Sequence, residues 1–185
     1  TVSGVIGDPY PDWLMNINTA LSWKGLTVSG LLDIRKGGDI WNGTNARMNR
    51  IGISEASGER DHTFVIEGVI EQADGSYVAN DIEIAPEDYW GDYLGDFGAS
   101  SQAIQDGGWV RLREVKLAYT FTLDPKNVIK GLSVSATGRN LWLKTDYLGV
   151  DPETSLTGAG SNISGFDWFN NPGTKSYLFS VSAAF

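Results

Sequence analysis

The chain has 185 residues and a net charge of −9, with no cysteine and a single histidine, His62. This composition excludes disulfides, thiolate chemistry and a multi-histidine metal site within one copy. No apolar run reaches the roughly 18 residues of a transmembrane helix, and the acidic balance argues against nucleic acid as a partner, because phosphate binding requires a basic surface.

The first predicted strand covers residues 12–24 and is apolar on one face only. Its odd positions run from Trp13 to Trp23 through mostly aliphatic residues, whereas most of its even positions are polar. Aromatic residues at both ends of an aliphatic face are typical of a strand that crosses a bilayer between aromatic girdles. A tight turn at Lys24 and Gly25 is expected to follow.

The second predicted strand, residues 26–36, has Leu26 to Ile34 on an apolar face and Asp33 and Arg35 on the opposite face. Charges inside a strand need water or a partner, so the second face is not expected to be a dry core. Both strands reach the length of about 9–11 residues that a tilted barrel strand needs to span lipid.

Residues 37–108 form an acidic segment. It holds 14 acidic residues against three arginines, a net charge of −11, which leaves about +2 for the rest of the chain. We expect a long outer loop that contains an internal hairpin, whose arms are predicted at residues 64–68 and 76–80.

The third and fourth strands are predicted at residues 109–123 and 132–143. Apolar residues alternate with polar or charged ones from Val115 to Leu123 and again from Leu132 onward. A turn is placed between these strands at residues 124–127. A second long loop, rich in Gly, Asn and Pro, covers about residues 144–173.

The last predicted strand, residues 175–185, places Tyr177, Phe179, Val181 and Phe185 on one face and mostly serines on the other. In a soluble β-sandwich the apolar face would pack against a core. In a transmembrane barrel it would face lipid.

The connections between these five strands alternate in length: short, long, short, long. Antiparallel strands joined in this way place both long loops at one end of the sheet, as in outer-membrane barrels. The predicted fold class is all-β. One segment, residues 1–185, is expected to form about five C-terminal strands of a larger antiparallel transmembrane β-barrel, since single-chain bacterial barrels need at least about eight strands to close. Residues 1–4 do not begin a signal peptide, so we expect a piece of a longer precursor.

Ordered motifs lie at residues 7–13 (GDPYPDW), 31–42 (LLDIRKGGDIWN), 108–119 (GWVRLREVKLAY), 138–142 (GRNLW) and 147–153 (YLGVDPE), and in the final strand that ends at Phe185. Together they resemble the C-terminal part of SusC/RagA-family TonB-dependent outer-membrane transporters.

The resemblance implies part of a 22-stranded barrel in the outer membrane of a Gram-negative bacterium. Such a barrel contains an N-terminal plug, is capped by a SusD-like surface lipoprotein and is powered through the TonB complex. It imports oligosaccharides or, in some members, peptides. The partners implied are therefore the remaining barrel and plug, the lipoprotein, the TonB complex, membrane lipid and the cargo, and no enzymatic activity is expected.

Aromatic residues in the predicted outer loops are the candidate substrate- or partner-binding residues: Trp41, Tyr89, Trp90 and Trp168, with Tyr93, Phe97 and Phe169 as further aromatics. Flat amphipathic rings stack on sugars or anchor a protein cap. The alternative is that they pack the long loops onto themselves.

The terminal strand has a predicted role of its own. On the resemblance, Tyr177, Phe179, Val181 and Phe185 form the signal that the barrel-assembly machinery recognises. The alternative is an ordinary final strand.

We expect neither a cofactor site nor a catalytic site among the acidic residues. Asp81, Glu83, Glu87, Asp88, Asp92 and Asp96 offer hard oxygen ligands for Ca²⁺, but their spacing lacks the EF-hand pattern, so a solvated acidic loop is expected. Asp151 and Glu153 resemble a carboxylate pair for glycoside hydrolysis, yet around Pro152 they are expected to organise a turn. Charged strand residues are expected to line the lumen or pair across strands: Arg111, Arg113, Glu114, Lys116 and Arg139.

On this resemblance we expect a non-enzymatic segment of a TonB-dependent importer of oligosaccharides or peptides. The alternative function is a secreted β-sandwich carbohydrate-binding module, which would stay soluble without detergent.

Overall fold

The computed structural model describes residues 4–98, 100–124, 126, 128–157 and 160–185. The chain forms two compact units. We call residues 9–38, 106–154 and 171–185 the strand unit, and residues 4–8, 39–105 and 155–170 the loop unit.

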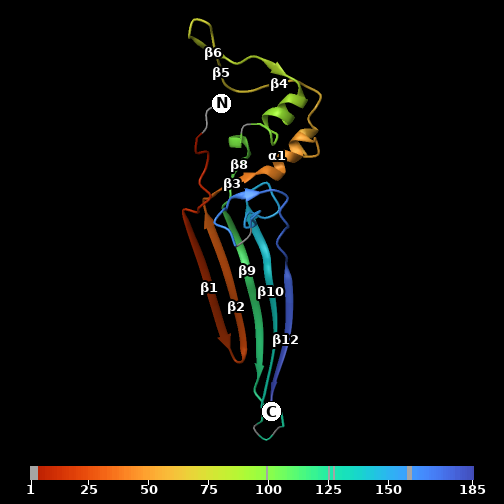
Figure 1. Ribbon diagram of the computed structural model, residues 1–185. Coiled ribbons are helices and arrows are strands. Elements are labelled where there is room, and N and C mark those ends of the chain that lie inside the picture. The colour runs from red at the N-terminus through yellow and green to blue at the C-terminus, as the bar shows by residue number, and fades with distance from the viewer. Residues whose placement is uncertain (1–3, 99, 125, 127, 158–159) are drawn as a thin grey trace. The chain divides into compact units, whose positions relative to one another are not determined.

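The strand unit is one five-stranded antiparallel sheet with the order β1-β2-β9-β10-β12 (Figure 1). Its strands are β1 (Trp13–Trp23), β2 (Leu26–Lys36), β9 (Trp109–Phe121), β10 (Gly131–Thr145) and β12 (Ser176–Ala184). The five predicted strands are confirmed, with ends that differ from the predicted ones by no more than two residues.

The turn between β1 and β2 is confirmed as well. Lys24 and Gly25 both have positive φ angles, 46° and 86°, and they connect the paired residues Trp23 and Leu26. Two positive φ values are characteristic of a two-residue hairpin turn whose twist matches that of its strands. The turn expected at residues 124–127 includes Pro125 and Asn127, which lie outside the described residues.

The strand register brings the apolar residues of all five strands onto one face. Leu21 pairs with Val28, Val28 with Leu117, and Leu117 with Ala136, which in turn pairs with Phe179. This face is exposed: the exposed fraction is 75% for Leu21 and 82% for Phe179. Among the described residues of the strand unit no second sheet covers it, whereas in a β-sandwich such faces are buried against each other.

Strand β9 contains a bulge at Arg113. Leu31 and Leu32 of β2 are adjacent, but their partners in β9 are Glu114 and Leu112, so Arg113 is an extra residue. A bulge of this kind bends a strand and redirects its side chains.

Both long connections leave the sheet at the same end, as predicted. Lys36 at the end of β2 and Trp109 at the start of β9 lie at this end, because Arg35 pairs with Trp109. Thr145 at the end of β10 also pairs with Trp109. The glycines that follow β2 are required by the backbone, since Gly37 and Gly38 have φ angles of 73° and 88°.

The loop unit is folded and mixes short strands with helices. A three-stranded sheet has the order β11 (Phe166–Asp167), β3 (Asp39–Asn42) and β8 (Ile104–Asp106). Asp106, the last residue of β8, belongs to the strand unit. Two small sheets pair β4 (Phe64–Val65) with β7 (Glu83–Ile84) and β5 (Val69–Glu71) with β6 (Tyr77–Ala79). The helices are α1 (Gly43–Arg50), the 3₁₀-helices η1 (Ala56–Gly58) and η3 (Ser100–Ala103), and the π-helix η2 (Asp88–Tyr93).

The internal hairpin was only partly predicted. Residues 76–80 do contain an arm, β6, but its partner is β5, and residues 64–68 do not supply it. The segment Phe64–Val65 pairs instead with Glu83–Ile84, so two short ladders are nested. β-propensity does not identify the partner of a two-residue strand, so the sequence could not specify this pairing.

Helix α1 was not predicted, and its start has a clear local cause. The Asn42 side chain accepts a hydrogen bond of 2.9 Å from the Asn45 backbone N–H and so caps the helix. Arg47 and Arg50 lie in the last turn, where positive charge is favourable. Among the described residues, no helix is long and apolar enough to cross a membrane.

Candidate functional site

Two of the four candidate binding residues, Trp41 and Trp168, stack on each other in the loop unit. Their ring centroids are 5.8 Å apart with an interplanar angle of 10°. A Cβ added at Gly43 would lie within 2.5 Å of both rings, so only glycine leaves room for the pair. The stack therefore depends on the residue that begins α1.

The hydroxyl of Thr44 holds the Trp168 side of this stack in place. It donates a hydrogen bond of 2.8 Å to the buried Asp167 carboxylate and accepts one of 2.6 Å from the Phe169 backbone N–H. Residues on both sides of Trp168 are thus tied to the first turn of α1.

The other two candidates, Tyr89 and Trp90, belong to a second aromatic cluster. Tyr89 stacks on Phe64 with centroids 4.1 Å apart, and Trp90 packs edge-on against Tyr89 at 5.0 Å. Tyr93 contacts Tyr89 at 5.7 Å. Each aromatic cluster packs segments of the loop unit against one another. The role of these residues in binding cargo or a partner stays a prediction.

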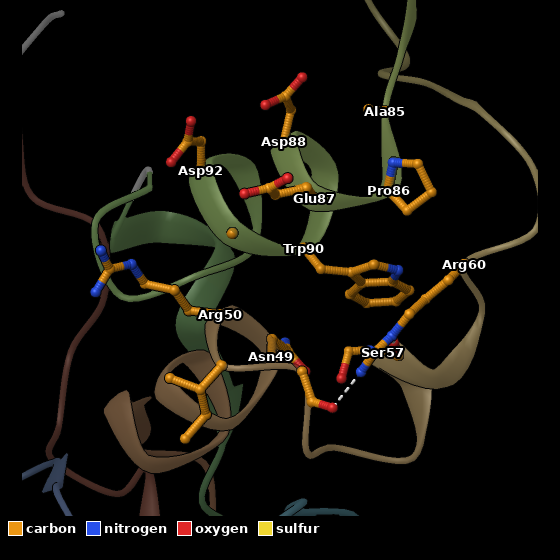
Figure 2. Close-up of a pocket in the computed structure, with 13 residues that line it drawn as sticks. Asn49, Arg50, Ser57, Arg60, Ala85, Pro86, Glu87, Asp88, Trp90 and Asp92 are labelled. Atoms are coloured by element: carbon orange, nitrogen blue, oxygen red, sulfur yellow. Dashed lines mark hydrogen bonds between the residues drawn. The ribbon is translucent and has the colours of Figure 1, made fainter.

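A pocket of about 790 Å³ lies beside Trp90 within the loop unit. Figure 2 shows Trp90 and the acidic residues Glu87, Asp88 and Asp92 on the helical turns at one side of it, with Asn49, Ser57 and Arg60 on the facing segment. Arg60 donates to the backbone oxygens of Gly52 and Ser57. A π-helix such as η2 is rare in proteins and is frequently found at functional sites.

Among the described residues, no group of three or more His, Asp or Glu side chains is arranged to hold an ion. Asp96 is bound instead by the last turn of α1, with Arg47 at 3.2 Å and Arg50 at 3.7 Å.

A network of charged side chains occupies the polar face of the strand unit. The buried Arg111 pairs with the buried Asp151 at 2.5 Å. Arg113 makes two hydrogen bonds to Glu153, of 2.8 and 2.7 Å, and one of 2.7 Å to Asp33. The segment after β10 is thereby fastened to β9 through two arginines.

The network explains the positions of Asp151 and Glu153. Asp151 accepts a 3.0 Å hydrogen bond from the Glu153 backbone N–H, and its carbonyl accepts one from Thr154. The pair organises a turn as expected, and each carboxylate is neutralised by an arginine. Cross-strand pairing was also expected, and Arg139 does pair with Glu114 at 2.9 Å.

The four residues of the predicted assembly signal lie where the alternation placed them. Tyr177, Phe179 and Val181 belong to β12 and share its apolar face, and Phe185 follows the strand. All four are exposed. Recognition by the assembly machinery stays a prediction.

Sequence reasoning missed two sets of residues. The pocket residues Asn49 and Arg60 carry no motif, because their proximity to Trp90 depends on how the loop unit folds. The arginine partners of Asp151 and Glu153 lie in the motif GWVRLRE, and the charges of this motif and of VDPE could have indicated that the two segments pair. Nothing in the sequence, however, specifies which charges meet.

Comparison with known proteins gives a consistent result. No family model matches the chain. It is 27% identical over 189 residues to TonB-dependent receptor P26 of Formosa agariphila, covering 98% of this chain and 18% of the relative. It is 23% identical to TonB-dependent receptor P3 of the same organism, covering 98% of this chain and 17% of that one.

Solved structures agree in fold. The RagAB peptide importer in its closed-closed state matches with a TM-score of 0.70 and 18% identity, over 98% of this chain and 18% of that chain. The open-open state matches with a TM-score of 0.66 and 20% identity, over 95% of this chain and 17% of that chain. The chain is a distant homologue of TonB-dependent receptors and spans about 18% of the length of P26. The named homologues are receptors and importers rather than enzymes.

Proposed function

We propose that this chain is a segment of the barrel wall of a TonB-dependent outer-membrane importer. The part of the wall that it supplies is its own five strands, β1, β2, β9, β10 and β12. The observation that carries the proposal is the continuous apolar face of the five-stranded sheet, exposed on every strand and opposed by a polar, charged face. One lipid-facing and one water-facing side is the pattern of a transmembrane β-barrel.

The distant homology supports the wider assignment. The relatives are TonB-dependent receptors and the fold matches part of the RagAB importer. We therefore infer an outer-membrane location, energy supplied through a TonB complex, a SusD-like surface lipoprotein as partner, and an oligosaccharide or peptide as cargo. In this assignment the loop unit lies on the outer side, where cargo and lipoprotein are met.

The rival function, a secreted β-sandwich carbohydrate-binding module, is disfavoured by the same sheet. A sandwich of this size would bury the face that contains Leu21, Phe179 and Val181, whose exposed fractions here are 75%, 82% and 74%. A water-soluble module with such a face would aggregate.

The proposal is tested on the full-length protein in its native bacterium. Membranes are separated by density, and the protein is extracted with and without detergent. We expect it in the outer-membrane fraction, soluble only in detergent and co-purifying with a surface lipoprotein. We also expect that deleting the TonB gene abolishes the growth that this protein supports on its cargo. A detergent-free soluble monomer in the medium would refute the proposal.

A further inference from the structure

We propose that the pocket beside Trp90 binds one sugar unit of an uncharged oligosaccharide. This inference rests on the proposed import function, and it names the class of cargo that the pocket accepts. Three features of the pocket support it: the flat ring of Trp90, the Asn49 amide in the opposite wall and the mixture of charges around them.

The Trp90 ring is a fixed apolar platform. Its indole N–H already donates to the Glu59 carbonyl oxygen at 3.1 Å, so the polar edge of the ring is satisfied by the protein. Edge-on contacts to Phe64 at 5.7 Å and Tyr89 at 5.0 Å support it. The ring is half-buried and lines the pocket together with Pro86 (Figure 2). The apolar C–H face of a pyranose ring fits such a surface.

Asn49 supplies a polar contact in the opposite wall. Its side chain lines the pocket although the residue is only 7% exposed. The amide oxygen accepts a 2.6 Å hydrogen bond from the Ser54 hydroxyl, whereas the amide nitrogen donates to no described residue. Because this nitrogen is accessible to solvent and has no acceptor among the residues that the structure describes, it can donate a hydrogen bond to a ligand in the pocket. A sugar hydroxyl is a suitable acceptor.

The charges around the pocket favour an uncharged ligand. Glu87, Asp88 and Asp92 are exposed on one side and form no ion pair within the described part of the chain, so they would repel an anion. Arg50 and Arg60 also line the pocket and would repel a cation. A hydroxyl group avoids both penalties, because it donates to carboxylates and accepts from amide or guanidinium groups. The volume of about 790 Å³ is sufficient for a sugar unit.

The test uses the full-length importer with its lipoprotein, purified in detergent. Binding is measured by calorimetry for maltohexaose, cellohexaose, laminarihexaose and xylohexaose as neutral probes, tetragalacturonate as the anion and pentalysine as the cation. Trp90→Ala removes the platform, Trp90→Phe keeps an aromatic ring, and Tyr77→Ala is the matched control, since Tyr77 is an exposed aromatic residue that does not line the pocket.

We expect at least one neutral probe to bind. Trp90→Ala should weaken that binding by about tenfold or more, as removal of a central aromatic contact does, while Trp90→Phe restores much of it and Tyr77→Ala leaves it unchanged. The triple variant Glu87→Gln, Asp88→Asn, Asp92→Asn should gain affinity for tetragalacturonate.

The inference is overturned if no neutral probe binds, if Trp90→Ala binds the neutral probe like the parent protein, or if pentalysine is the preferred probe. Circular dichroism of each variant verifies that its barrel is folded. An importer that remains TonB-dependent while Trp90→Ala has no effect on binding would refute this pocket and leave the proposed function intact. Absence of the protein from the outer membrane would refute the proposed function itself.

Discussion

Arg111 and Asp151 form a buried ion pair, with side chains that are 5% and 7% exposed. Such a pair contributes little by itself, because desolvation of both charges offsets their attraction. Loss of Asp151 is different, since it would leave the buried Arg111 with only the half-exposed Glu153, 3.5 Å away, as a carboxylate partner. The importance of the pair therefore lies in joining the segment after β10 to strand β9.

We predict that Asp151→Asn in the full-length protein lowers its free energy of unfolding by about 1–3 kcal/mol, as measured by urea unfolding in detergent micelles. Glu114→Gln is the control. Its pair with Arg139 is half-exposed, and we expect a loss of only about 0–1 kcal/mol there. Equal effects of the two substitutions would contradict the assigned difference in burial.

The protonation of Asp74 is coupled to the stability of the turn between β5 and β6. Hydrogen bonds from the Ser76 hydroxyl at 2.6 Å and from the Ser76 backbone N–H at 2.9 Å lower the pKa of Asp74 below its ordinary value. A lowered pKa in the folded state means that the turn between β5 and β6 is stabilised by ionised Asp74. This stabilisation is present above the ordinary aspartate pKa and is lost as pH falls through the lowered value.

We predict that Ser76→Ala raises the pKa of Asp74 toward its ordinary value, because the largest cause of the shift, the hydroxyl hydrogen bond, is removed. The measurement is an NMR titration of the Asp74 carboxyl carbon. Ser100→Ala, a serine outside this turn, should leave the titration of Asp74 unchanged. An unaltered pKa in Ser76→Ala would show that the backbone N–H suffices.

At the scale of elements, β12 has two faces with different expected tolerance to charge. Phe179 is on the apolar face, paired with Ala136, and Ser180 is on the opposite face, paired with Ser135. We predict that Phe179→Arg reduces outer-membrane insertion of the full-length protein, since arginine on a lipid-facing strand costs about 2–4 kcal/mol near the bilayer centre.

Ser180→Arg is the matched control for Phe179→Arg, because it adds the same charge at the next residue. Insertion is followed by heat-dependent migration of the barrel in detergent gels and by its amount in the outer-membrane fraction. If Ser180→Arg is the more harmful of the two, the assignment of the lipid-facing side is wrong.

The long strands were predictable from the sequence because each carries a period-two alternation over nine residues or more. Trp13–Trp23 and Leu26–Lys36 show it with few exceptions, such as Leu14 and Leu31, and a one-residue slip would move every side chain to the other face. Helix α1 and the nested ladders of the loop unit were not predictable. Gly43–Arg50 has eight residues, and the two-residue strand Phe64–Val65 is too short for any period to be read.

The candidate site was predictable in its residue types but not in its geometry. Aromatic residues in outer loops pointed to Trp41, Tyr89, Trp90 and Trp168, and the structure sorts them into two separate clusters. The contact between Trp41 and Trp168 joins residues 127 positions apart in sequence. Its formation depends on Gly43 and on the Thr44 hydrogen bonds.

At the scale of the whole molecule, the chain consists of a strand unit and a loop unit with different expected surroundings. If the strand unit lies in the membrane, a protease added to intact cells reaches only the loops. We predict that proteinase K cleaves the full-length protein within residues 39–105 or 155–170 while β1, β2, β9, β10 and β12 remain intact.

Thr44→Val should increase the rate of this cleavage at residues 155–170 without lowering the amount of protein in the outer membrane. The substitution removes the hydroxyl that ties Asp167 and Phe169 to α1 and leaves the strand unit unchanged. Cleavage is located by mass spectrometry of the released peptides. Protection of the loops in intact cells, or cleavage within the five strands, would contradict the proposed topology.

Because Arg113 is an extra residue in β9, the alternation of side chains between the two faces of the strand shifts by one residue at this position. Odd residues such as Val115 and Leu117 share a face with even residues such as Leu112, because the parity of the strand changes at the bulge. Deleting Arg113 would leave Leu112 and Glu114 adjacent, opposite Leu32 and Leu31, and Arg111 would remain opposite Asp33 on the polar face. A one-residue insertion or deletion elsewhere in β9 would instead exchange the two faces on one side of the change, a constraint on chain length that no individual side-chain contact imposes.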